Sequence, residues 1–175
     1  MKLLNYIRDG QSRIGLKTGK GVVDLSELAS LQGERIPNRM EDLIKGGYLP
    51  KVKGLLKSLV EQSLNLNYLP EDDLVYRPAV ENPGKILCVG LNYLKHIEEG
   101  KDNRSTNVPK EPVLFSKFNS SLAGHGETIP IPELAKQVDY EGELVVVMGR
   151  EARAISEEEA LDYVFGYTIG NDISA

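Results

Sequence analysis

Two glutamates, Glu141 and Glu143, lie two residues apart directly before an apolar run at residues 144–148 (LVVVM). Successive strand residues point to opposite faces, so positions i and i+2 share one face, roughly 6.6 Å apart along the strand. The run is typical of a strand covered on both faces, where a carboxylate must be paired or coordinate a cation. Oxygen ligands with no nearby cysteine or paired histidines favour Mg²⁺, Mn²⁺ or Ca²⁺ over zinc. The alternatives are a strand entrance still in water, or ion pairs with Arg150 or Lys136.

A third acid, Asp172, is a candidate ligand of the same ion. It lies near the end of an apolar stretch at residues 167–174 (YTIGNDIS). We predict that this stretch is a strand, that it follows a crossover helix, and that it lies beside the strand of Glu141 and Glu143. The alternative is a strand-end turn that Asp172 makes with Asn171.

A second polar cluster is suited to general base catalysis. His96 and Glu99 are three residues apart in the segment LKHIEEG (residues 94–100), so they share a face of a helical turn, whereas Glu98 points elsewhere. A carboxylate beside an imidazole orients it and raises its basicity, which enables His96 to take a proton from water near neutral pH. The alternative is a surface histidine with an incidental acid.

The elements that must position these residues begin at Lys85. We predict strands at residues 85–90, 112–118, 138–149 and 167–174, a short helical turn at 94–100, and a helix from 156 to about 166. Ser156 and Glu159 have the spacing of a capping box at the start of that helix. The polar loop from Lys101 to Pro112 is long enough to act as a lid.

The first part of the chain has a different pattern. Residues 1–28 alternate short apolar runs with turn signals at Asp9-Gly10 and Gly19-Lys20-Gly21, which predicts a small antiparallel meander. Residues 40–66 have helical periodicity, which Gly46-Gly47 and Pro50 divide into two helices. The polar, proline-marked stretch at residues 69–83 predicts a boundary between a small α+β domain (1–80) and a second domain (81–175).

Composition narrows the class of partner. The chain has 175 residues, of which 41% are hydrophobic, and its net charge is −5 (21 basic and 26 acidic side chains). No basic stripe with interleaved aromatic residues occurs, which argues against nucleic acid and favours a small-molecule partner. The single cysteine, Cys88, lies in an apolar run, is expected in the core, and suits a reducing compartment. Because neither a signal peptide nor a membrane-spanning segment is predicted, the expected location is the cytoplasm.

The order of these pieces resembles the fumarylacetoacetate hydrolase family. The similar segments are KILCVGLNYLKHIEE, PVLFSKFNSSLAGHGETIPIP, VDYEGELVVVMGR and DYVFGYTIGNDISA. The resemblance implies a mainly β catalytic domain of rolled, mixed sheets with a divalent ion, usually Mg²⁺ or Mn²⁺, and it favours a homodimer. It implies Glu141, Glu143 and Asp172 as metal ligands, His96 and Glu99 as the catalytic pair, and Lys117 as a substrate-binding residue. The first 80 residues resemble the small N-terminal domain of members named 2-hydroxyhepta-2,4-diene-1,7-dioate isomerases.

Three features depart from the family pattern. Phe118 follows Lys117 where members usually have proline, and His125 lies between two glycines where proline is common. His125 is expected either to point into solvent or to point at substrate. Family members continue beyond the segment that ends here at Ala175, so we expect an incomplete catalytic domain, because a buried strand with no following turn leaves a sheet edge exposed.

These residues predict a metal-dependent enzyme that acts on a small carboxylate substrate. The expected reaction is hydrolysis of a carbon–carbon bond in an acylpyruvate-type 2-oxo acid or 1,3-dicarbonyl acid, through a metal-stabilised enolate and water activated by His96 and Glu99. The alternatives are an isomerase of the 2-hydroxyhepta-2,4-diene-1,7-dioate type, an oxaloacetate decarboxylase, or a non-catalytic metal-binding or assembly module. A serine hydrolase of the G-x-S-x-G type is excluded because that motif does not occur.

Overall fold

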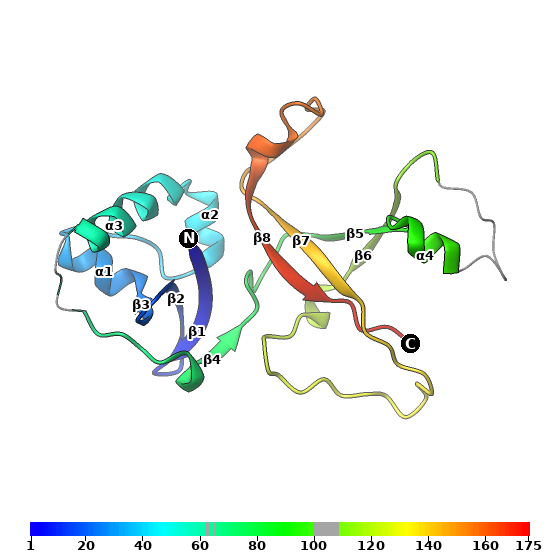
Figure 1. Cartoon of the computed structure of the whole chain (residues 1–175), viewed down its shortest axis with the longest axis horizontal. Coiled ribbons are helices and arrows are strands. Elements are labelled where there is room, and N and C mark those ends of the chain that lie inside the picture. Colours follow the sequence, from blue (N-terminus) through cyan, green and yellow to red (C-terminus); the bar gives the residue numbers. More distant parts are fainter. Residues whose placement is uncertain (62–63, 65, 100–108) are drawn as a thin grey trace. The chain divides into compact units, whose positions relative to one another are not determined.

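The computed structural model describes residues 1–61, 64, 66–99 and 109–175 of the chain, which Figure 1 draws from its first to its last residue. The described residues form two compact units: residues 1–81 together with 123–175, and residues 82–122. The secondary structure is mixed α+β, as predicted. No helix in the described ranges is long and apolar enough to cross a membrane.

The first unit begins with a four-stranded antiparallel sheet. Its strands are β1 (Lys2–Arg8), β2 (Gln11–Thr18), β3 (Gly21–Asp24) and β4 (Val75–Arg77), in the spatial order β3-β2-β1-β4. Asp9 and Gly10 connect β1 to β2 with positive φ angles of 52° and 70°, a geometry whose twist suits a two-residue hairpin turn. The meander predicted for residues 1–28 is confirmed as far as Asp24, whereas residues 25–28 are helical instead.

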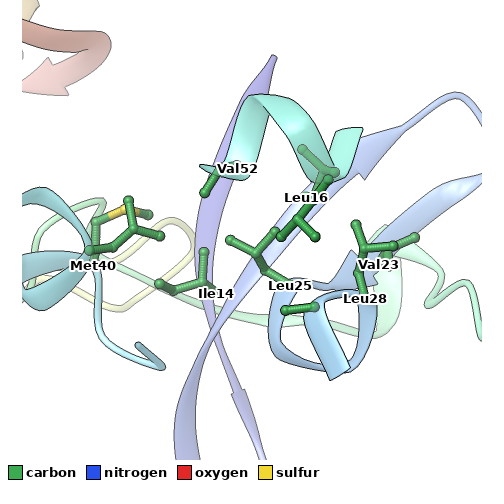
Figure 2. Packing of buried hydrophobic residues seen from close by; sticks show 10 residues of the cluster. Ile14, Leu16, Val23, Leu25, Leu28, Met40 and Val52 are labelled. Carbon is green, nitrogen blue, oxygen red and sulfur yellow. The ribbon is translucent and has the colours of Figure 1, made fainter. Parts of the chain in front are cut away.

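Three helices share one apolar core with this sheet: α1 (Leu25–Leu31), α2 (Met40–Lys45) and α3 (Leu49–Glu61). Figure 2 shows how their side chains meet those of the strands; the labelled residues are Ile14, Leu16, Val23, Leu25, Leu28, Met40 and Val52. Helices α2 and α3 confirm the two helices predicted between residues 40 and 66. Pro50 does not break a helix but lies in the first turn of α3, where a backbone N–H has no helical partner in any case.

Helix α1 is not predicted by the sequence pattern, and its N-terminal cap explains why it forms. The carboxylate of Asp24 accepts hydrogen bonds from the backbone N–H groups of Ser26 (2.9 Å) and Glu27 (3.0 Å). These two donors would otherwise have no partner in a helix of seven residues. Leu28 on the inner face of α1 is completely buried. The cap and the core contacts together therefore stabilise a helix that is too short to be stable on its own in water.

The stretch predicted as a domain boundary, residues 69–83, contains structure of its own. A short 3₁₀ helix, η1 (Glu71–Asp73), precedes β4, which pairs with β1. Leu69 also exchanges two backbone hydrogen bonds with Val22, at 2.9 and 2.8 Å. Part of this stretch therefore belongs to the N-terminal sheet, and the division into residues 1–80 and 81–175 stays a prediction.

The described residues of the second unit form a two-stranded antiparallel ribbon and a short α-helix. Strand β5 (Ile86–Gly90) pairs with β6 (Val113–Lys117), and helix α4 (Leu94–Glu99) follows β5, as the sequence predicts. A 3₁₀ turn, η3 (Asn119–Ser121), follows β6. Cys88 of β5, expected in the core, is half-buried. Of the predicted lid at residues 101–112, residues 101–108 lie outside the described residues.

A second ribbon, which belongs to the first unit, carries the acids. Strand β7 (Gly142–Met148) pairs antiparallel with β8 (Val164–Asn171), and the two run side by side in Figure 1. The predicted helix from residue 156 is wrong. Ser156 does donate its backbone N–H to Glu159 (3.2 Å), but only a 3₁₀ turn follows, η4 (Ala160–Tyr163), and β8 begins at Val164. No crossover helix is required, because antiparallel neighbours are joined without one.

The surroundings of β7 also differ from the prediction of a strand covered on both faces. Leu144 and Val146 are 63% and 45% exposed. The physical reason is that the faces of β7 lack a packing layer: within the described part of the chain, no residue of β7 belongs to the apolar core cluster. Closure of the ribbons into one rolled sheet stays a prediction.

Candidate metal site

The register of the β7–β8 ribbon aligns the three candidate ligands. Gly142 lies opposite Asn171 and Glu143 opposite Gly170. Continuing this register places Glu141 opposite Asp172, and the backbone N–H of Asp172 donates to the carbonyl of Glu141 at 2.8 Å. Residues directly opposite each other in an antiparallel pair face the same side, as do positions i and i+2. Glu141, Glu143 and Asp172 therefore share one face at one end of the ribbon.

Asp139 is a further acid on this face that the sequence analysis did not single out. Asp139 and Ser174 form an isolated bridge beyond the ends of the strands, with backbone hydrogen bonds of 2.9 and 3.1 Å in the two directions. Asp139, Glu141 and Glu143 thus alternate along one edge, and the D-x-E-x-E spacing was the available signal. The Asp139 carboxylate accepts a hydrogen bond from the N–H of Tyr140 (2.8 Å).

The chemistry of this donor set fits a hard divalent cation, but the side chains are not gathered into a ligand cage. Among the residues that the structure describes, no group of three or more His, Cys, Asp or Glu side chains is close enough to hold a metal ion. Glu143 and Asp172 are half-buried and Glu141 is exposed. Carboxylate oxygens are the ligands that Mg²⁺, Mn²⁺ and Ca²⁺ prefer, and Gly170, opposite Glu143, has no side chain to occupy the shared face.

The two cations considered as partners of these acids have other contacts. The guanidinium of Arg150 lies 4.0 Å from the centroid of the Tyr163 ring, within the range of a cation–π interaction. The ammonium of Lys136 donates to the carbonyl of Glu133 at 2.9 Å. The observed contacts of Arg150 and Lys136 thus do not support the alternative of ion pairs with Glu141 and Glu143.

The predicted catalytic pair belongs to the second unit. The backbones of His96 and Glu99 lie in α4, as the helical spacing requires, and the neighbouring Ile97 is buried with 8% exposure. The side chains of His96 and Glu99 lie outside the described part of the structure. Their pairing, and the role of each in catalysis, stay predictions.

Lys117 lies at the end of β6 and lines an open pocket of about 330 Å³, together with Ile86, Leu87, Ser116 and Phe118. Its ammonium is 5.8 Å from the centroid of the Phe115 ring. Phe118, the departure from the family pattern, is 82% exposed. The volume is within the range of small-molecule pockets, so the position of Lys117 is compatible with binding a small carboxylate.

His125 is exposed, but it is not directed only into solvent. Its ring meets the edge of the Tyr76 ring with centroids 5.6 Å apart and an interplanar angle of 83°. Two residues further on, Glu127 accepts a hydrogen bond from Arg77 at 2.8 Å. Because Tyr76 and Arg77 both belong to β4, these contacts give the loop at residues 124–127 a structural role in the first unit.

Comparison with known proteins yields one family. The sequence profile described as "Fumarylacetoacetate (FAA) hydrolase C-terminal" matches residues 85–175. The chain is 36% identical to a fumarylacetoacetate hydrolase domain-containing protein 2 homolog of Dictyostelium discoideum, over 100% of this chain and 55% of that protein. It is also 36% identical to the mitochondrial oxaloacetate tautomerase fahd2 of Xenopus laevis, over 93% of this chain and 48% of that protein.

The fold has counterparts among solved structures. A maleylpyruvate hydrolase of Sphingobium sp. SYK-6, crystallised with manganese (II) ion and pyruvate, superposes with a TM-score of 0.72 and 23% identity. The match covers 99% of this chain and 58% of that structure. The chain spans about half the length of the curated relatives it matches.

Proposed function

The chain belongs to the fumarylacetoacetate hydrolase family, and we propose that it carries the divalent-metal site of an enzyme that acts on a small 2-oxo acid. The observation that supports this proposal is that Glu141, Glu143 and Asp172 share one face of the β7–β8 ribbon. All three lie within the residues that match the family profile. Their carboxylates would hold Mg²⁺ or Mn²⁺, with Ca²⁺ as a substitute.

The metal and the substrate class fit each other chemically. The hydrolase that shares this fold was crystallised with manganese (II) and pyruvate, and pyruvate is a 2-oxo acid. A divalent ion held by these carboxylates would supply positive charge that stabilises the enolate form of a 2-oxo acid. Lys117, at the edge of its pocket, would provide a cation for a carboxylate of the substrate.

His96, oriented by Glu99, would transfer a proton during the reaction. Their spacing on α4 suits a histidine whose orientation and basicity a carboxylate sets. In a tautomerase, His96 would take a proton from the carbon next to the 2-oxo group, and the enolate oxygen would take up a proton to give the enol; the reverse transfer, from the enol oxygen to that carbon, would give back the 2-oxo acid. In a hydrolase, His96 would take a proton from water as the water adds to the distal carbonyl.

We rank keto–enol tautomerisation of a 2-oxo dicarboxylic acid such as oxaloacetate first. The supporting observation is that the oxaloacetate tautomerase of Xenopus laevis is similar over 93% of this chain at 36% identity. Hydrolysis of an acylpyruvate is the second candidate, supported by the maleylpyruvate hydrolase of the same fold. In that reaction the bond between the enolate carbon and the hydrated carbonyl breaks, giving a carboxylic acid and the enol of pyruvate, which then takes up a proton.

Calorimetric titration with Mn²⁺ tests the metal site. We expect saturable binding by the 175-residue chain, loss of binding in Glu141→Gln, and no change in the matched control Glu151→Gln, an exposed glutamate beyond the end of β7. The titration must be repeated with Mg²⁺, because both ions fit the donor set. Binding by Glu141→Gln that equals binding by the parent would show that the metal ligands are assigned wrongly.

Two assays on the Mn²⁺-loaded protein distinguish the reactions. The ultraviolet absorbance of the oxaloacetate enol reports tautomerisation, and release of pyruvate from an acylpyruvate reports hydrolysis. His96→Ala is expected to abolish turnover and to leave Mn²⁺ affinity unchanged. A protein that binds Mn²⁺ but turns over neither substrate would count against both reactions and would favour the alternative of a metal-binding or assembly module. Sedimentation of the same sample tests the expected homodimer.

A further inference from the structure

At the candidate metal site, a side-chain oxygen replaces a backbone carbonyl as acceptor in the hydrogen-bond ladder between β7 and β8. In a regular pair of this type, opposite residues exchange two backbone hydrogen bonds, as Asp139 and Ser174 do. At the next such pair, Asp172 donates to the carbonyl of Glu141 (2.8 Å). In the other direction the N–H of Glu141 donates to the side-chain oxygen Oδ1 of Asn171 at 3.0 Å.

The carbonyl of Asp172, which a regular ladder would use, has a different partner. It accepts a hydrogen bond from the hydroxyl of Ser174 at 3.2 Å. The Asn171 side chain therefore takes the place of a backbone acceptor between the two strands. The acceptor thus comes from Asn171, the residue before Asp172, whose carbonyl would accept this bond in a regular ladder. The hydrogen bond holds the main chain of Glu141 against the end of β8.

We infer that Asn171 is a positioning residue of the metal site: it keeps Glu141 in register with Asp172, so that two ligands from different strands face the same ion. This inference rests on the proposed function, because the hydrogen bond can position metal ligands only if Glu141 and Asp172 ligate a metal. Partners of ligand residues commonly alter metal affinity when they are removed. Asn171 itself need not touch the ion.

Three variants separate this role from a general effect on folding. Asn171→Leu has a similar size but no acceptor for the N–H of Glu141, whereas Asn171→Asp keeps an oxygen at the same position. Thr168→Val is the matched control, because Thr168 lies on β8 opposite Val145, away from Glu141. Two quantities are measured for each protein: the hydrogen exchange rate of the Glu141 amide without metal, and the dissociation constant for Mn²⁺ by calorimetry.

We expect Asn171→Leu to speed exchange of the Glu141 amide and to weaken Mn²⁺ binding about threefold to tenfold, the effect of losing one hydrogen bond beside a ligand. Asn171→Asp and Thr168→Val are expected to bind Mn²⁺ at least about as tightly as the parent. Mn²⁺ affinity that is lost in Asn171→Leu but kept in Asn171→Asp would show that the acceptor oxygen of Asn171 supports metal binding.

Several outcomes would overturn the inference. Faster exchange in Asn171→Leu with unchanged Mn²⁺ affinity would make Asn171 structural only, and equal losses in Asn171→Asp would exclude the acceptor as the cause. In both cases the parent still binds Mn²⁺, so the proposed metal site stands. Failure of the parent itself to bind Mn²⁺ would refute the metal site, and with it the role of Asn171.

Discussion

Asp24 is the residue whose loss we expect to destabilise the N-terminal part of the chain most. Its side chain is 1% exposed and accepts three hydrogen bonds: from the Tyr6 hydroxyl (2.8 Å) and from the backbone N–H groups of Ser26 and Glu27. The Nε of Arg13 lies 3.9 Å from the same carboxylate. One residue thus joins β1, β2 and helix α1.

The magnitude follows from these contacts. Loss of a helix N-cap costs about 1 kcal/mol, and loss of a hydrogen bond to a buried charged group costs about 1.5 to 3 kcal/mol. Arg13 adds to this: among the described residues its buried Nε makes no hydrogen bond, and the carboxylate of Asp24, 3.9 Å away, balances its charge. We therefore expect Asp24→Ala to lower the free energy of unfolding by about 3 to 4 kcal/mol, a large fraction of the stability of a typical domain.

Urea unfolding followed by far-ultraviolet circular dichroism measures this change, since the chain has no tryptophan for fluorescence. Asp24→Asn keeps an oxygen acceptor for the helix cap and is expected to lose about half as much. The control is Glu34→Ala, which removes a half-exposed carboxylate 2.7 Å from Lys51 and should change stability by less than about 1 kcal/mol. A loss below about 1 kcal/mol in Asp24→Ala, or an equal loss in Glu34→Ala, would show that the hydrogen bonds of Asp24 do not stabilise the protein as expected.

Three further predictions concern other parts of the chain. Burial, followed by the hydrogen bond to Asp24 and the charge of Asp24, raises the pKa of Tyr6 above the ordinary value of 10.0. Because the unfolded chain loses this proton near pH 10 and the folded protein keeps it, the free energy of unfolding should fall above pH 10 by about 1.4 kcal/mol per pH unit until native Tyr6 ionises. Tyr6→Phe should remove this slope in urea titrations on both sides of pH 10, and an unchanged slope would contradict the assignment. Gly21→Ala should destabilise the protein more than Gly47→Ala. Both glycines have a positive φ, but of the two only Gly21 has a backbone atom, the carbonyl oxygen of Leu69, within 2.7 Å of where a Cβ would lie. Equal losses of stability in urea unfolding would argue against this contact. Lys117→Met should raise the KM for a 2-oxo acid about tenfold and leave Mn²⁺ affinity unchanged, and an unaltered KM would remove Lys117 from the substrate site.

Local sequence signals were sufficient for several elements. The Asp9-Gly10 turn between alternating apolar runs predicted the β1–β2 hairpin, because few residues adopt its positive φ angles readily. The two-residue period of a strand was enough to assign Glu141 and Glu143 to one face. The motifs from residue 85 onward were enough to identify the family.

Other elements depend on contacts that no local pattern contains. Strand β4 is three residues long and exists through pairing with β1, about 70 positions earlier in the chain. The segment after Ser156 has a capping contact but only a 3₁₀ turn and no α-helix, because Leu161 is 73% exposed and a short helix without a buried face is unstable in water.

The candidate site shows the same division between sequence and structure. The two-residue period of strands predicted that Glu141 and Glu143 share one face, and the apolar stretch before Asp172 predicted a strand, which in the structure ends at Asn171. No local pattern predicts that β8 runs antiparallel to β7, in the register that sets Asp172 opposite Glu141 and lets Asn171 hold the Glu141 backbone. Register depends on hydrogen bonds between residues about 30 positions apart, and a shift of one residue would send Asp172 to the other face.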